Sequence, residues 1–211
     1  MEQMKGSLSR PVLGCVIALI LWTIMFSPWT SPYVNFWVMM TCSGLVLTTY
    51  STLAAPGWWK DIKMGWKDIV IGITLAAALW GIFWIGDRLS SMMFDFARPQ
   101  VNLIYGMKEG ENPVVLTLLM LLIIGPAEEI FWRGFIQKSF SKRWNPDLGF
   151  IITTLVYGLV HLAKFNFMLI MAALVAGFVW GLAYRFFPER LGAIILSHAL
   201  WDCAVFIWFP I

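Results

Sequence analysis

The sequence is poor in charged residues. Only 13% of its 211 residues are Asp, Glu, Lys or Arg, and 60% are hydrophobic, whereas soluble domains average about 25% charged residues. This scarcity of charge excludes an ordinary soluble domain. The sequence also has no polar insert long enough to form a separate soluble domain. We therefore predict an all-α, polytopic membrane protein that forms one integral membrane domain over residues 1–211.

Cysteines and clustered positive charge are also scarce. The three cysteines, Cys15, Cys42 and Cys203, lie within apolar runs, which excludes a disulfide framework and favours small core residues. The net charge is +3, but the basic residues are scattered at the ends of apolar runs. A nucleic-acid surface needs clustered basic residues, so we expect no nucleic-acid partner and assign these charges to membrane orientation.

Long apolar runs dominate what remains. They predict about seven transmembrane helices of roughly 20 residues each, over residues 11–29, 33–55, 69–86, 113–137, 148–163, 166–187 and 191–210. The first run is not followed by a small-residue cleavage site, so we expect it to be a permanent span. We also expect an interfacial helix over residues 56–68, with Trp58, Ile62 and Trp66 on one face. A short amphipathic helix around residues 89–96 would end at Pro99.

The distribution of Lys and Arg predicts the orientation. With the N-terminus in the cytoplasm, eleven of these residues lie on the cytoplasmic side or its span ends and four lie outside. Cytoplasmic loops are enriched in Lys and Arg. We therefore expect a cytoplasmic N-terminus and an external C-terminus.

A few ionisable residues interrupt the apolar runs. Glu128, Glu129 and Asp202 lie within them, as do His161 and His198, which are the two histidines of the chain. An ionisable side chain at the bilayer centre costs about 2.5–3.5 kcal/mol and usually marks function. The five residues together predict a polar site inside the membrane.

Helical spacing divides the fourth run into a pair and a free carboxylate. Glu129 and Arg133 are four residues apart, so their side chains meet and neutralise each other. Glu128 is turned by about 100° from Glu129 on a helix, which leaves its carboxylate available for another partner. An intramembrane pair of this kind can also be only a packing clasp between helices.

The same spacing recurs in two later runs. Tyr157 precedes His161 by four residues, and His198 precedes Asp202 by four. Asp202 can therefore orient the imidazole of His198 or share a ligand with it. Each histidine alone would equally suit a hydrogen-bonded link between helices.

The stretches "EEIFWR" (128–133), "YGLVH" (157–161) and "HALWD" (198–202) resemble the motifs of the CPBP intramembrane proteases. This is the CAAX protease and bacteriocin-processing family, whose eukaryotic members remove the last three residues of prenylated CAAX proteins. The resemblance covers about residues 113–205. Tyr157 replaces the more usual Phe, and Asp202 stands where the best-understood members have Asn.

The resemblance implies a role for each site residue. Glu128 would be the base that activates a water, and His161 would hold that water and deliver a proton to the leaving amine. His198 would donate to the oxyanion, while Glu129, Arg133 and Tyr157 would support the site. An ionised Asp202 only accepts hydrogen bonds. Among protonation, orientation of His198 and metal ligation, we expect Asp202 to orient His198.

A zinc ion is the alternative to metal-free chemistry. His161 and His198 with Glu128 or Asp202 would form a plausible ligand set with an open position for water. We expect no metal, because a metal-bound Glu128 could not act as the base, and neither an HExxH nor an HxxEH motif is present.

The resemblance thus implies an intramembrane endopeptidase. Its substrate would be a hydrophobic or lipid-modified peptide in contact with membrane lipid. The small size of the chain is similar to that of prokaryotic members. We therefore expect the protein in a prokaryotic cell membrane. Two alternatives remain: a catalytically silent binding or immunity protein on the same scaffold, and a proton-coupled transporter. The sequence predicts no particular oligomeric state.

Overall fold

The computed structural model describes residues 8–211, and every regular element in this range is helical. Seven helical stretches are long and apolar enough to cross a membrane. This confirms the predicted class of an all-α, polytopic membrane protein. Lys5, which contributed to the orientation count, lies outside the described residues. The main helices are α1 (Ser9–Phe26), α2 (Phe36–Ala54), α3 (Trp66–Met93), α4 (Ala97–Tyr105), α8 (Pro146–Leu159), α9 (Phe167–Phe186) and α10 (Leu191–Cys203).

The fourth span, Pro113–Arg143, is one continuous helical stretch of mixed winding. It consists of α5 (Pro113–Leu119), a π-helical segment (Met120–Ile124), α6 (Gly125–Glu129), a second π-helical segment (Ile130–Gln137) and α7 (Lys138–Arg143). A third π-helical segment, Ala204–Trp208, extends α10. Such π-helical insertions are rare and frequently occur at functional sites.

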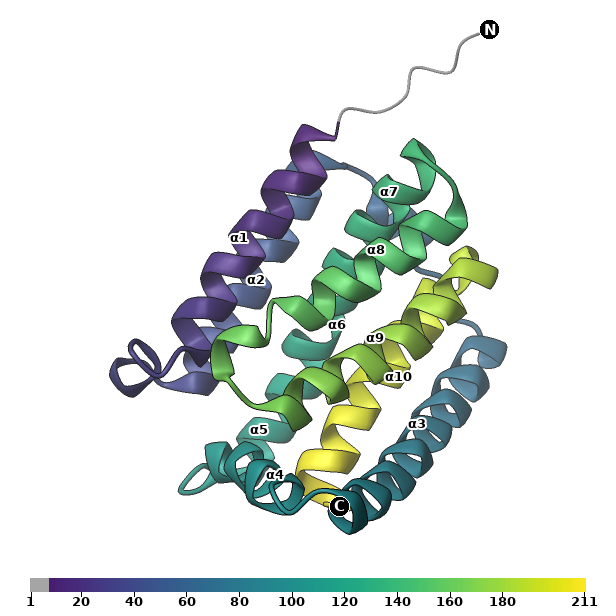
Figure 1. Cartoon of the computed structure of the whole chain (residues 1–211). Helices are drawn as coiled ribbons and strands as arrows, with labels where there is room; N and C mark the ends of the chain where they lie inside the picture. Colours follow the sequence, from purple (N-terminus) through teal and green to yellow (C-terminus); the bar gives the residue numbers. More distant parts are fainter. Residues whose placement is uncertain (1–7) are drawn as a thin grey trace, which may run out of the picture.

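The fourth and seventh spans form the interior of the bundle. In their most apolar windows 50% and 61% of the residues are buried, against 17% for α3. Figure 1 shows α1 and α2 side by side at one edge and α3 at the other edge, with the α5–α7 stretch between them. Helix α10 packs against α3 and α6, and α8 packs against α9. The two innermost spans carry five of the seven predicted site residues.

A glycine permits the close approach of α6 to α10. A Cβ atom on Gly125 would lie 2.8 Å from the Cα of Ala199 and 2.9 Å from its backbone nitrogen. Only the absence of a side chain allows this distance. The contact packs the start of α6 against α10 at Ala199, the residue that follows His198.

Asparagine side chains begin four of the helices. The Oδ1 atom of Asn35, Asn112, Asn145 or Asn166 accepts a backbone N–H of the first turn of α2, α5, α8 or α9, respectively. Asparagine is among the best residues at this position, because the first N–H groups of a helix have no partner within it. Asn166 also donates to the carbonyl of Gln100 at 2.9 Å, which ties α4 to the start of α9.

The predicted interfacial helix over residues 56–68 is wrong. Gly57 has a φ of +96°, a short 3-10 helix covers Trp58–Asp61, and Trp66 is already the first residue of α3. The side chain of Asp68 accepts the N–H of Gly65 at 2.9 Å. This cap begins the third span earlier than hydropathy indicated.

The predicted amphipathic helix around residues 89–96 is also wrong. Helix α3 continues to Met93, and Pro99 lies in the first turn of α4 rather than at the end of a helix. Proline is tolerated there because the N–H groups of a first turn need no partner within the helix. Met92 and Met93 are exposed at the end of the long third span.

Candidate active site

The seven predicted site residues are all buried, and they come from three spans. Glu128 and Glu129 end α6, and Arg133 lies in the π-helical segment that follows. Tyr157 lies in the last turns of α8 and His161 follows that helix, whereas His198 and Asp202 belong to α10. The structure therefore brings the three motif stretches together.

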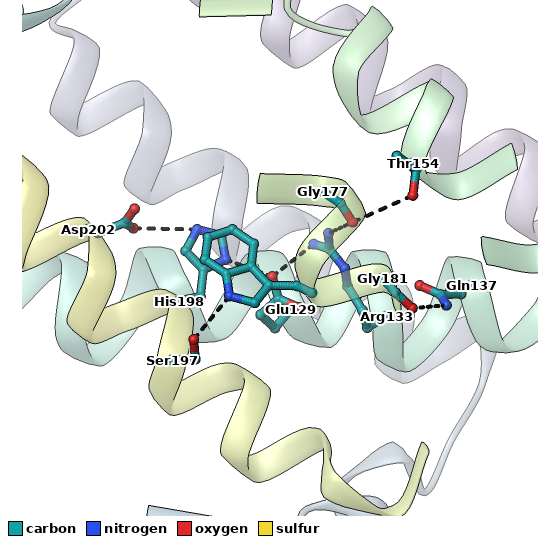
Figure 2. A network of polar contacts seen from close by, with 10 residues as sticks. Glu129, Arg133, Gln137, Thr154, Gly177, Gly181, Ser197, His198 and Asp202 are labelled. Atoms are coloured by element: carbon teal, nitrogen blue, oxygen red, sulfur yellow. Dashed lines mark hydrogen bonds and ion pairs between the residues drawn. The ribbon is translucent and has the colours of Figure 1, made fainter. Parts of the chain in front are cut away.

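Glu129 is the centre of the polar network in Figure 2. Its Oε1 atom accepts a hydrogen bond from Nη1 of Arg133 at 2.8 Å and one from Nδ1 of His198 at 2.7 Å. The predicted pair of Glu129 and Arg133 is confirmed, but Glu129 also binds a residue outside this pair. The same carboxylate connects the fourth span to α10 and fixes the ring of His198.

Arg133 is held by a backbone carbonyl and by aromatic faces. Its Nη2 atom donates to the carbonyl of Gly177 at 3.0 Å. The guanidinium carbon lies 4.9 Å from the ring centre of Tyr157 and 5.7 Å from that of Trp180, which places the cation over two π faces. These contacts let a charged side chain that is only 1% exposed remain inside the bundle.

Trp180 and Ser197 are parts of the site that the sequence did not reveal. The Trp180 ring stacks on the imidazole of His198, with 3.8 Å between centroids and 17° between planes. Its indole N–H donates to the hydroxyl of Ser197 at 3.1 Å. The only available signal was the position of Trp180 in the middle of a span, because membrane tryptophans gather at the interfaces.

The position of Asp202 corrects one expectation. Its Oδ2 atom lies 3.6 Å from Nε2 of His198, which is too long for a hydrogen bond. Glu129, not Asp202, makes the hydrogen bond that orients this ring. Asp202 lies near the other ring nitrogen of His198 without a hydrogen bond to it.

His161 is engaged at both ring nitrogens. Nδ1 lies 2.8 Å from the carbonyl oxygen of Tyr157, and Nε2 lies 3.1 Å from the indole nitrogen of Trp22. A carbonyl only accepts and an indole N–H only donates. The ring is therefore the neutral Nδ1–H tautomer, with its Nε2 lone pair taken by Trp22.

This arrangement differs from the expectation that His161 directly holds a water. Trp22 lies in α1 and is fully buried, in a part of the chain that carries none of the three motifs. Nothing in its sequence surroundings distinguished it from the other tryptophans of the apolar runs. The nitrogen that would hold the water is occupied in this structure.

A cavity of about 480 Å³ connects the remaining site groups. Glu128, Tyr157, His161, His198 and Asp202 all line it, and its other walls are mostly aliphatic and aromatic side chains from α2, α3, α4 and α9. The Oε2 atom of Glu128 is buried without a hydrogen-bond partner. A buried carboxylate oxygen without a partner is costly, so this atom is available to a ligand or a water in the cavity.

The residues suggested as zinc ligands do not fit a metal site. Within residues 8–211, no three His, Cys, Asp or Glu side chains lie close enough together to hold a metal ion. In addition, Nε2 of His161 accepts from Trp22 and Nδ1 of His198 donates to Glu129. We therefore derive no step through a metal.

Comparison with known families found one match. The family model for type II CAAX prenyl endopeptidases, Rce1-like, matches residues 110–204. This segment begins just before α5 and ends just after α10, so it contains all seven predicted site residues and Trp180 but leaves Trp22 outside. Neither a curated protein nor a solved structure matches the chain.

Proposed function

Since the chain belongs, through residues 110–204, to the Rce1-like family of type II CAAX prenyl endopeptidases, we propose that it is an intramembrane endopeptidase. It hydrolyses a peptide bond in a hydrophobic or lipid-modified peptide, with a water activated by Glu128. The observation that carries this proposal is the unpartnered Oε2 atom of Glu128 in a cavity that His161 and His198 also line. The cavity is the natural place for a scissile bond because Glu128, His161 and His198 line it together with apolar side chains that suit a hydrophobic peptide.

The reaction needs a base, an oxyanion donor and a proton for the leaving group. Glu128 accepts a proton as the water oxygen bonds to the substrate carbonyl carbon. His198 acts as the imidazolium cation: it donates Nδ1–H to Glu129 and Nε2–H to the oxygen that becomes negative. The C–N bond then breaks, and the proton taken by Glu128 passes to the amine through Nε2 of His161.

The last step requires Trp22 to release His161. The indole hydrogen bond at 3.1 Å occupies the nitrogen that must carry the proton. In the proposed cycle the arrangement with this hydrogen bond is the resting state, and α1 takes part in the cycle through Trp22.

Replacing Trp22 by Phe is expected to raise kcat/KM by about two- to tenfold, because one hydrogen bond is worth about 0.5–1.5 kcal/mol. Phe keeps an aromatic ring against Trp132 and His161 but removes the donor. Initial cleavage rates of the purified variant measure the effect. A fall in kcat/KM with unchanged thermal stability would show that Trp22 positions His161 rather than blocking it.

Filling the cavity is expected to prevent substrate binding. A Cβ atom on Gly86 of α3, which lines the cavity, would meet no atom within 4 Å. Leu at this position therefore fits the fold, and we expect it to lower kcat/KM by at least about tenfold, as an obstructed apolar pocket does. Gly81→Leu is the matched control: its Cβ also meets open space, but Gly81 does not line the cavity. Equal losses in both variants would contradict the assignment of the cavity to the substrate.

The direct test of the proposed function uses the purified protein in lipid vesicles. It is incubated with peptides of one sequence, either prenylated near the C-terminus or unmodified, and products are identified by mass spectrometry. We expect cleavage of the membrane-bound peptide. Binding of the peptides without any product would favour a silent binding protein on the same scaffold.

A further inference from the structure

The two ends of the bundle differ in positive charge. Among residues 8–211 one end carries nine Lys and Arg residues and the other carries four; Arg133 lies between them. The basic end holds Arg10, Lys60, Lys63, Lys67, Lys138, Lys142, Arg143, Arg185 and Arg190, and the opposite end holds Arg88, Arg98, Lys108 and Lys164. Figure 1 shows these ends as the top and the bottom of the view. The excess of Lys and Arg places the basic end in the cytoplasm.

The cavity lies entirely toward the opposite end. Its lining residues from α3 come from the second half of that helix, Ile82–Ser90, and those from α9 come from the first half. Residues between the long spans also line it, and these are Phe94, Val101, Ile104, Tyr105 and Met107. No lining residue comes from the three connections at the basic end, which cover residues 55–65, 144–145 and 187–190.

A packed layer closes the site toward the basic end. Trp132, Gln137 and Trp180 are fully buried, and Arg133 is 1% exposed. Arg133 and Gln137 donate to the carbonyl oxygens of Gly177 and Gly181 at 3.0 Å and 2.8 Å, which fastens the fourth span to α9 (Figure 2). A substrate cannot pass this layer without breaking the network that holds His198.

From the position of the cavity, the packed layer on its other side and the charge asymmetry together, we propose that this enzyme takes its substrates from the non-cytoplasmic side of the membrane. The substrate is a peptide that an apolar anchor holds in the outer half of the bilayer, with its scissile bond next to the anchor. This inference rests on the proposed endopeptidase function. It separates the enzyme from the processing of cytosolic prenylated tails, which lie at the cytoplasmic leaflet.

The orientation of the cavity is tested by cysteine labelling in intact cells. Cys15, Cys42 and Cys203 are first replaced by Ser. Glu109→Cys then marks the exposed loop two residues from the cavity residue Met107, and Lys142→Cys marks the exposed basic end. With a membrane-impermeant maleimide we expect Glu109→Cys to react in intact cells and Lys142→Cys to react only after permeabilisation. The reverse pattern overturns the inference.

The side of cleavage is tested by labelling new N-termini. Cells that produce the wild-type protein or Glu128→Gln are treated with a membrane-impermeant, amine-reactive biotin reagent, and labelled termini are compared by mass spectrometry. We expect termini that depend on Glu128 to be labelled in intact cells, and the sequences after them show whether the anchor is a lipid chain or an apolar segment. Termini labelled only in inverted vesicles would overturn the inference about the side of cleavage, while the proposed endopeptidase function would stand. Absence of any dependent terminus would count against the proposed function itself, while the cysteine result would still decide which way the cavity faces.

Discussion

Glu128→Gln abolishes peptide cleavage and leaves the fold intact: this is the largest effect that we expect. Gln has the shape of Glu but cannot take a proton from water, and the loss of a general base lowers rates by about 10²–10⁴-fold. The Oε2 atom of Glu128 has no hydrogen-bond partner in the protein. Replacing the carboxylate therefore breaks no bond at that atom and removes a buried charge, so thermal stability should not fall.

The measurement compares cleavage rates and thermal unfolding of the purified variant with those of the wild type. Glu109→Gln makes the same chemical change at an exposed loop residue and should leave both quantities unchanged. Full activity in Glu128→Gln would end the proposed mechanism. A large loss of stability would instead mean that Glu128 holds the helices together.

Glu129→Gln is expected to lower both stability and activity. Glu129 accepts hydrogen bonds from Arg133 and His198, and its side chain is fully buried. Without its charge the guanidinium of Arg133 is buried and unpaired, and breaking a buried pair costs about 3–5 kcal/mol. His198 loses the carboxylate that orients it, so cleavage should fall as well.

A double variant separates the two effects. Glu129→Gln combined with Arg133→Met removes both charges, and replacing a whole buried pair by groups without charge is often neutral. We therefore expect it to regain stability but not activity, because His198 still lacks its carboxylate. Recovery of activity together with stability would show that Glu129 acts only through the fold.

Asp147→Asn provides the control for an ordinary ion pair. Asp147 accepts from Arg185 at the surface, with side chains 63% and 25% exposed. Exposed pairs are worth about 0–1 kcal/mol. Thermal unfolding of the purified proteins should show a small change for Asp147→Asn and a large one for Glu129→Gln.

The sequence allowed the spans and the presence of a buried cluster of ionisable residues to be predicted. Apolar runs are long in this chain, and an ionisable residue inside one is conspicuous because burying it is costly. Spacing within one helix is also readable, so the pair of Glu129 and Arg133 was predicted correctly. All these signals are local.

Partners on different helices could not be predicted. Glu129 had its expected neighbour on its own helix, and only the position of α10 reveals that it also holds His198. Likewise, Trp22 is one of 13 tryptophans and has no local feature that links it to His161. The prediction of a helix over residues 56–68 was wrong for a different reason. The pattern of apolar residues does not reveal the left-handed conformation of Gly57.

The apolar cavity wall also determines how the reaction depends on concentration. The proposed substrate is anchored in the bilayer, so it approaches the cavity, whose wall includes Phe83 and Val175, by diffusion in the plane of the bilayer. Its relevant concentration is then the number of molecules per unit of membrane area, and the volume of the surrounding water does not enter. The proposed endopeptidase would consequently respond to crowding, expansion or thinning of the membrane that carries it, even when the total amount of substrate in the cell stays constant.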